Sequence, residues 1–172
     1  ITCMFTDLKG FTTLSERLGT EQTVKLLNSY FDRMSEVLLR HEATISKFLG
    51  DGIFAFFGAP DVMLDHPRKA AAAAIDLRDE LRRFCRELAG QTPPLAMRVG
   101  LATGLAMFGN CGSSRKFDYT ALGPTVNLAS RLEGANKFFG TGIMVSGETA
   151  CQIEQDFLLR PLGAVRVVGV QH

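Results

Sequence analysis

The sequence lacks both a long hydrophobic run and a marked excess of charge of either sign. Lysine and arginine number 19 against 18 aspartates and glutamates, which gives a formal net charge of +1. We therefore expect no basic surface that would bind nucleic acid. No apolar run approaches the ~20 residues of a membrane-spanning helix, and no signal peptide is recognisable. The 172 residues, 46% of them hydrophobic, suit one globular domain with a substantial core.

Cysteine is scarce and scattered along the chain. The four cysteines have neither the spacing of a metal site nor a compact disulfide pattern: Cys3, Cys85, Cys111 and Cys151. Each has apolar neighbours, so we predict four small buried residues, as expected of a protein in a reducing compartment.

The most informative stretch is a pair of apolar runs on either side of Gly50-Asp51-Gly52. The runs predict two antiparallel strands joined by a tight turn, and Asp51 alone would fit a structural turn residue. Lys47 changes this interpretation, because it lies inside the first run. A buried ammonium group needs a carboxylate, a solvent opening or a ligand. The turn carboxylate and the strand lysine together therefore indicate a functional site.

The N-terminal segment predicts a buried strand followed by a phosphate-binding loop. Residues 1–6 form the apolar strand, and Asp7 stands at its end. A capping-box spacing places the start of the next helix near Thr13. The N–H groups of the intervening loop, residues 7–12, and the helix N-terminus could together hold phosphate. Asp7 considered alone could equally be a cap or turn acceptor.

The rest of the chain intersperses helices and strands. Periodicity and capping signals predict helices at 20–41, 67–88, from 124 onward and from 146 or 147 to 155. Strands are predicted at 95–105, with 106–111 as its return, and at 143–146, 157–160 and 164–168. In the helix at 20–41 the predicted core stripe is Val24, Leu27, Phe31, Met34 and Leu38. Because the strands pair mainly through hairpins, we predict an α+β fold rather than a doubly wound parallel sheet.

Two strand-end carboxylates, a strand lysine and an Asn/Arg pair form a set suited to phosphoryl-type transfer. Two carboxylates can hold Mg²⁺ or Mn²⁺, whose remaining ligands are phosphate oxygens and waters. Asn127 and Arg131 lie four residues apart on one helix face, and the arginine can stabilise charge on phosphorus. A surface ion pair with Glu133 or Glu148 is the alternative for Arg131. No Walker A motif is present, so the phosphates would rest on the loop at 7–12.

Three motifs carry a specific resemblance to a known family. They read FTDLKGFT at Phe5–Thr12, KFLGDG at Lys47–Gly52 and YTALGPTVNLASRLE at Tyr119–Glu133. In this order they resemble the class III nucleotidyl cyclase catalytic domain, and the match covers nearly the whole chain. The resemblance implies a ferredoxin-like core, with a mostly antiparallel sheet flanked by helices. It also implies a head-to-tail homodimer with active sites at the interface.

The resemblance assigns roles on one side of the site to the N-terminal motifs. Asp7 and Asp51 match the two metal aspartates, with two Mg²⁺ or Mn²⁺ per active site, and the carbonyl of Leu8 would add a ligand. The loop residues Gly10, Phe11 and Thr12 match positions that hold phosphate. The reaction would be attack of the ATP ribose 3′-oxygen on the α-phosphorus, releasing pyrophosphate and 3′,5′-cyclic AMP.

The opposite protomer would supply the residues that bind the nucleoside. The resemblance assigns Lys47 and Thr120 to the purine, Asn127 to the ribose and Arg131 to the transition state. Lys47 can donate to N1 of adenine and Thr120 can accept from N6. Guanylyl enzymes of the family usually have an acidic residue at the lysine position, and the threonine resembles the subgroup with bicarbonate-responsive soluble adenylyl cyclases. We therefore predict ATP as the substrate.

One departure from the family pattern leaves other functions open. Val168-Gly169 stands where many members carry a lysine that reaches the triphosphate, and Arg166 could substitute for it. The alternatives are a guanylate cyclase or an enzyme of mixed specificity, and a catalytically weak domain that regulates a partner. A palm-type relative using the same two-metal chemistry is a further alternative, which the Asn127/Arg131 helix disfavours.

The ends of the chain fall within or just after strand-like runs. The sequence begins at Ile1 without methionine and ends at His172. We interpret residues 1–172 as a single cyclase catalytic domain, excised from a longer protein and lacking the last strand of the family. An upstream sensory domain is expected in the parent protein. The domain itself would be cytoplasmic, and the parent could be tethered to a membrane.

Overall fold

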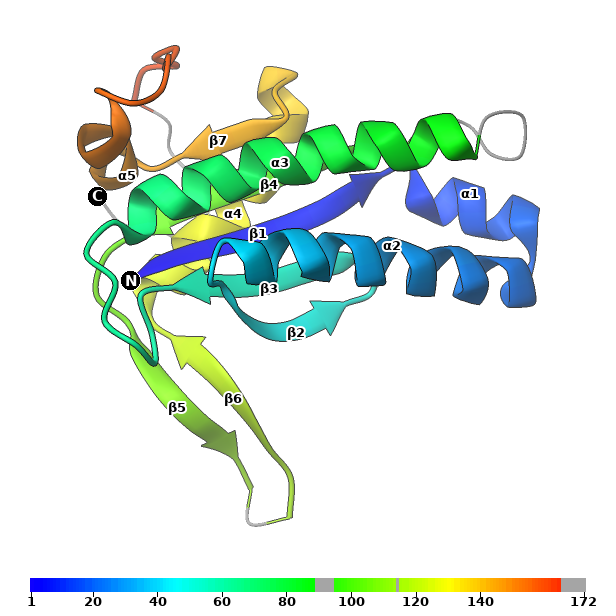
Figure 1. Cartoon of the computed structure of the whole chain (residues 1–172), viewed down its shortest axis with the longest axis horizontal. Helices are drawn as coiled ribbons and strands as arrows, with labels where there is room; N and C mark the ends of the chain where they lie inside the picture. The colour runs from blue at the N-terminus through cyan, green and yellow to red at the C-terminus, as the bar shows by residue number, and fades with distance from the viewer. Residues whose placement is uncertain (89–94, 114, 165–172) are drawn as a thin grey trace.

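The computed structural model describes residues 1–88, 95–113 and 115–164 (Figure 1). The elements are β1 (Thr2–Lys9), α1 (Phe11–Leu18), α2 (Thr20–Arg40), β2 (Thr44–Leu49), β3 (Gly52–Phe57), α3 (His66–Glu87), β4 (Ala96–Thr103), β5 (Met107–Gly112), β6 (Phe117–Leu122), α4 (Pro124–Phe139), β7 (Ile143–Val145) and α5 (Gly147–Ile153). Among the described residues, no helix is both long and apolar enough to cross a membrane.

The main sheet has five strands in the order β2-β3-β1-β4-β7. Neighbouring strands are antiparallel except β4 and β7, which run parallel. The central strand, β1, pairs with β3 from Thr2↔Phe57 and with β4 as far as Lys9↔Ala96. The first four strands with their intervening helices form a ferredoxin-like arrangement. The predicted α+β class, with a mostly antiparallel sheet flanked by helices, is confirmed.

Helices cover both faces of this sheet. Figure 1 shows α2 and α3 on the near face and α4 behind the strands. The near core includes Met4, Tyr30 and Leu77, and the core beneath α4 includes Phe56 and Ala129. All six residues of β3 are buried, because this strand has a neighbour on each side and helices over both faces. This explains its unbroken apolar run.

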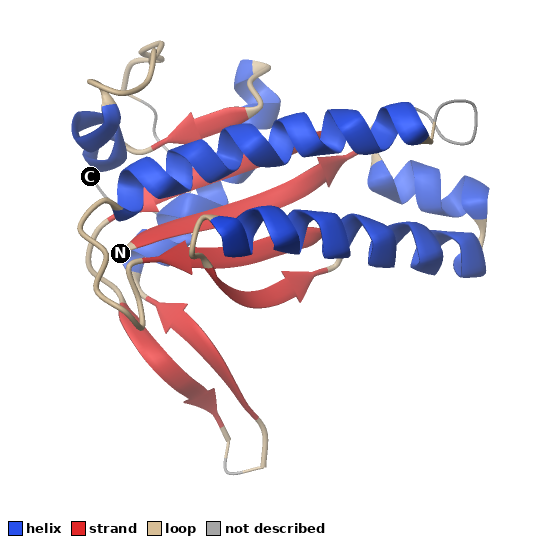
Figure 2. Cartoon of the chain, in the orientation of Figure 1, coloured by secondary structure: helices blue, strands red, loops and turns tan. Residues whose placement is uncertain are grey.

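The β5–β6 hairpin stands apart from the main sheet, as Figure 2 shows. The prediction that residues 106–111 return along the strand at 95–105 is wrong, because β5 pairs with β6 instead. Both edges of β4 are already occupied by β1 and β7, so β5 has no place beside it. The hairpin exposes apolar side chains, among them Leu105 just before it, 93% exposed, and Met107, 81% exposed.

Several predicted boundaries and burial patterns differ from the structure. Helix α1 begins at Phe11, two residues before the predicted start, because Gly10 takes a left-handed conformation and begins the turn there. Along α2 the stripe is shifted: Val24 is 50% exposed, whereas Leu26 and Tyr30 are buried. Two of the cysteine predictions are wrong, since Cys111 lies on the protruding hairpin and Cys151 on the outer side of α5, and both are exposed.

The predicted C-terminal strand pair is the last difference. Residues 157–160 form no strand, and instead Phe157 and Leu159 pack against the near core after α5. Of the partner strand predicted at 164–168, only Ala164 is described. Arg166 and Val168, which bear on triphosphate binding, lie outside the described residues.

Candidate active site

The turn between β2 and β3 lies against the end of β1. The N–H of Leu8 donates to Asp51 Oδ2 at 3.3 Å. The approach is so close that a Cβ on Gly52 would lie 2.4 Å from the carbonyl oxygen of Thr6, which explains a glycine after Asp51. Strand β1 continues to Lys9, so Asp7 lies within the strand and not at its end as predicted. The structure thus brings Asp51 next to Leu8, one residue from Asp7.

Asp7 is neutralised by an arginine that the sequence analysis missed. Arg98 on β4 lies opposite Asp7 in the strand register, and its guanidinium donates to Asp7 Oδ2. Its Nε also lies 3.2 Å from Glu133 Oε1 on α4, although the N–H does not point at that oxygen. Arg98 lies in an apolar strand and is 19% exposed at its side chain. The reasoning that singled out Lys47 would therefore have found Arg98 as well.

The carboxylates around Arg98 carry more negative charge than the arginine balances. Burial raises the pKa of Asp51, and the negative charge of Asp7 raises it further. The pKa of Glu133 is raised by the same two causes in the same order. Glu133 contacts Arg98 and not Arg131, which forms no ion pair among the described residues, so the predicted surface pair is wrong. A further cation would therefore be favoured at this place.

The donor set fits Mg²⁺ or Mn²⁺ bound together with a phosphate. Asp7, Asp51 and the Leu8 carbonyl are hard oxygen donors. In the described ranges, no group of three or more histidine, cysteine, aspartate or glutamate side chains could hold a metal ion alone. Magnesium commonly takes one or two carboxylates and completes its shell with substrate phosphates and water. The residues therefore suit a metal site that the nucleotide completes.

The start of α1 provides a place for phosphate next to these carboxylates. Gly10, with φ of 79°, turns the chain from β1 directly into α1. The first backbone bond of the helix runs from Leu14 N–H to the Gly10 carbonyl, and the N–H groups of the first turn have no partner within the helix. The amides of Phe11 and Thr12 belong to that turn, so they can hold an anion.

A second group of polar residues joins β2 to β6. Lys47 Nζ donates to Asp118 Oδ2 at 3.2 Å, which confirms that this lysine needs a carboxylate. Ser46 Oγ lies 2.9 Å from Thr120 Oγ1 and 3.1 Å from the Tyr119 carbonyl oxygen. Lys47 and Thr120, both assigned to the purine, are thus held by neighbouring contacts. Ser46 and Asp118 were missed, because no local spacing links β2 to β6.

Helix α4 carries the remaining two candidates. Asn127 is exposed and Arg131 half-buried. Gly100 of β4 lets the helix lie directly on the sheet, since a Cβ there would be 2.2 Å from the Ala129 carbonyl oxygen. Among the described residues, no hydrogen bond or ion pair joins Lys47, Thr120, Asn127 or Arg131 to Asp7 or Asp51. A single chain therefore displays two separate half-sites.

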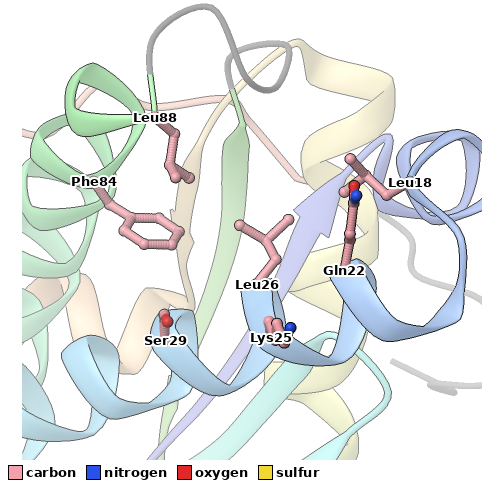
Figure 3. Close-up of a pocket in the computed structure, with 7 residues that line it drawn as sticks. All are labelled: Leu18, Gln22, Lys25, Leu26, Ser29, Phe84 and Leu88. Atoms are coloured by element: carbon pink, nitrogen blue, oxygen red, sulfur yellow. The ribbon is translucent and has the colours of Figure 1, made fainter.

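A pocket of about 470 Å³ lies between α1, α2 and the end of α3 (Figure 3). Its lining is mainly apolar, with polar side chains at one edge: Leu18, Gln22, Lys25, Leu26, Ser29, Phe84 and Leu88. None of the candidate site residues lines it. The pocket is therefore separate from both half-sites.

Comparison with known proteins gives a consistent family. The family model described as "Adenylate and Guanylate cyclase catalytic domain" matches residues 1–172. The chain is 40% identical over 170 residues to adenylate cyclase 1 of Rhizobium meliloti, covering 98% of the chain and 26% of that protein. It is 31% identical over 179 residues to an adenylate cyclase of Anabaena cylindrica, covering 98% of the chain and 34% of that protein. The chain thus spans well under half the length of these relatives.

Solved structures of both an adenylyl and a guanylyl cyclase resemble this fold. The adenylyl cyclase CyaB from P. aeruginosa matches with a TM-score of 0.94 and 37% identity, covering 99% of this chain and 88% of that chain. The guanylyl cyclase Cya2 matches with a TM-score of 0.91 and 35% identity, covering 99% and 86%. Overall similarity therefore does not separate the two purines.

Proposed function

Because the chain belongs to the family of adenylate and guanylate cyclase catalytic domains, the class III nucleotidyl cyclases, we propose that it converts ATP into 3′,5′-cyclic AMP and pyrophosphate. The observation that carries the proposal is the meeting of Asp7, Leu8 and Asp51 beside the N-terminus of α1. This arrangement provides hard oxygen donors next to backbone amides that suit phosphate.

On the acidic side, Asp7, Asp51 and the Leu8 carbonyl would hold two Mg²⁺ or Mn²⁺ ions. When bound, the ions would lower the pKa of the ribose 3′-hydroxyl and neutralise phosphate charge. The loop residues Gly10, Phe11 and Thr12 would position the phosphates through backbone amides. Arg98, which contacts Asp7 in this structure, orients that carboxylate and adds positive charge at the site.

On the opposite side, four residues would bind and orient the nucleoside. Lys47, held by Asp118, would donate to N1 of adenine, and Thr120 would accept from the N6 amino group. Asn127 would bind the ribose so that its 3′-oxygen lies in line with the α-phosphorus. Arg131 would stabilise the charge that develops on the phosphorus oxygens. A lysine at position 47 suits adenine, whereas guanine has a donor at N1.

We infer further that two chains assemble head to tail, so that each site combines both half-sites. Two observations support this. The half-sites of one chain share no hydrogen bond or ion pair among the described residues. The β5–β6 region exposes apolar side chains that a partner could cover, such as Leu105 and Met107. The upstream sensory domain, the cytoplasmic location and the membrane tether of the parent protein stay predictions.

The first experiment is to incubate the chain with Mn²⁺ and either ATP or GTP and to identify the products by chromatography. We expect cyclic AMP as the main product, and no product from Asp51→Ala, because that variant loses a proposed metal ligand. Thermal unfolding of the variant would check that it remains folded.

Other outcomes would each contradict part of the proposal. Mainly cyclic GMP would overturn the roles given to Lys47 and Thr120. No product from a chain that is dimeric by sedimentation would favour a regulatory, weakly catalytic domain, and Val168→Lys would then test the missing phosphate cation. Activity retained by Asp51→Ala would remove Asp51 from the metal site.

A further inference from the structure

Strand β2 is irregular at Ser46, the residue next to the purine-binding lysine. Successive side chains of a regular strand point to opposite faces. Ser46 and Lys47 nevertheless both contact β6. The register with β3 shifts between Ile45↔Ala55 and Lys47↔Phe54, so Ser46 is the extra residue of a β-bulge. Bulges commonly re-aim side chains beside active sites, and this one turns Ser46 toward Thr120.

We propose that Ser46 is a positioning residue that favours adenine over guanine by setting the hydrogen-bonding role of Thr120. This inference rests on the proposed function, which places the Thr120 hydroxyl against the six-position of the purine. A threonine hydroxyl alone does not distinguish the purines, because it can accept from the N6 amino group of adenine or donate to O6 of guanine. Something else must make one role more favourable.

Ser46 has two possible acceptors and one proton. Its Oγ lies within donating distance of the Tyr119 carbonyl oxygen, at 3.1 Å, and of Thr120 Oγ1, at 2.9 Å. The single hydroxyl proton serves only one of them at a time. The Tyr119 carbonyl can only accept, whereas Thr120 can either accept from Ser46 or donate to it.

With adenine bound, all the groups can be satisfied together. The N6 amino group donates to Thr120, the Thr120 hydroxyl donates to Ser46, and the Ser46 hydroxyl donates to the carbonyl of Tyr119. Each hydroxyl donates once and accepts once. Because Thr120 is only 6% exposed, water has little access to replace a missing bond in this chain.

With guanine bound, one hydrogen bond of this chain is lost. The Thr120 hydroxyl must donate to O6, so it has no proton for Ser46. Ser46 then donates either to Thr120, which leaves the Tyr119 carbonyl without this donor, or to Tyr119, which leaves two oxygens facing each other without a proton. Net loss of one hydrogen bond corresponds to about fivefold in relative affinity.

The test measures kcat/KM of the 172-residue chain for ATP and for GTP. We expect Ser46→Ala to lower the ratio of the two values by about fivefold, mainly through KM, because Thr120 becomes free to donate to O6. Ser46→Thr keeps the hydroxyl and suits a strand, so it should restore the ratio. The matched control is Thr44→Val on the same strand, which removes a bond of 2.6 Å from Thr44 Oγ1 to the Ala59 carbonyl but does not touch Thr120. Its ratio should stay that of the unmodified chain.

The result that overturns the inference is an equal fall for both nucleotides in Ser46→Ala, or a shift of the same size in Thr44→Val. Either would show a general structural effect. If the unmodified chain makes no cyclic nucleotide, the proposed activity fails, but Ser46 is still tested. Dissociation constants for ATP and GTP, measured by calorimetry with Mn²⁺, should then shift by about the same factor in Ser46→Ala. An unchanged ratio of dissociation constants would reject the role of Ser46.

Discussion

Among single residues, Arg98 has the largest influence on the charge balance of the candidate site. It donates to Asp7 and lies beside Glu133, while Asp51 adds a third carboxylate nearby. Burial and the charge of Asp7 already raise the pKa values of Asp51 and Glu133 with the arginine present. Removing the guanidinium would therefore leave carboxylates close together without their cation, and a divalent metal would become their natural partner.

Arg98→Met should make the chain less stable without metal and more responsive to metal. We expect the free energy of unfolding in metal-free buffer to fall by about 2 kcal/mol, because partly buried carboxylates lose their counter-charge. Mn²⁺ should raise the Tm of this variant more than that of the unmodified chain. Urea unfolding and thermal scans would measure both effects.

A surface arginine gives the control for this prediction. Arg82 on α3 is 62% exposed at its side chain and pairs only with Asp79. Arg82→Met should change the unfolding free energy by no more than about 0.5 kcal/mol. If Arg98→Met were equally mild, Arg98 would not neutralise the acidic group in solution.

Among the secondary-structure elements, α4 has the closest contact with the sheet. A Cβ on Gly100 would lie 2.2 Å both from the Ala129 carbonyl oxygen and from the Glu133 nitrogen. These are backbone atoms of a helix, so they cannot turn aside as a flexible side chain can. The same helix carries Asn127 and Arg131, and their positions relative to the sheet therefore depend on a glycine at position 100.

Gly100→Ala should push α4 away from β4. We expect the unfolding free energy to fall by about 3 kcal/mol, since overpacking against helix backbone is costly. Cyclase activity should fall further than the loss of folded protein explains, because Asn127 and Arg131 move. Gly134→Ala is the matched control: Gly134 lies within α4 with nothing within 4 Å of its added Cβ. That variant should gain about 0.5–1 kcal/mol from higher helix propensity, and a loss there instead would point to the helix itself.

The elements set by local signals could be predicted from the sequence. The turn at Asp51-Gly52 between two apolar runs predicted β2 and β3, and Pro124 predicted the start of α4. Choices among distant partners could not be predicted. Periodicity marked residues 106–111 as a strand, but only the occupied edges of β4 direct β5 to β6.

The candidate site shows the same division between local and distant information. The apolar surroundings of Lys47 predicted a carboxylate partner, yet that partner, Asp118, lies 71 positions later. The bulge at Ser46 leaves no mark in the sequence, because the residues around it alternate as well as any strand. The roles given to Asp7, Asp51, Thr120, Asn127 and Arg131 stay predictions, and the structure adds Arg98 and Ser46 to the residues worth testing.

For the molecule as a whole, the separation of the two half-sites determines how the proposed enzyme must assemble. The acidic half-site lies at the end of β1, and the nucleoside half-site involves β2, β6 and α4. In a head-to-tail dimer of identical chains, each active site takes one half from each partner. A chain that lacks one half can then still contribute the other.

Mixing two inactive variants should therefore restore activity. Asp51→Ala and Arg131→Ala damage different half-sites, so a mixed dimer contains one intact site and one doubly damaged site. With random pairing, half of the dimers are mixed, and activity should recover to about a quarter of that of the unmodified chain. Asp51→Ala mixed with Asp7→Ala is the matched control, because both damage the same half-site and every dimer stays inactive. Product formation in the two mixtures, at a concentration where sedimentation shows dimers, would decide. If the first mixture stays as inactive as the second, each chain completes its own site and the head-to-tail dimer is wrong.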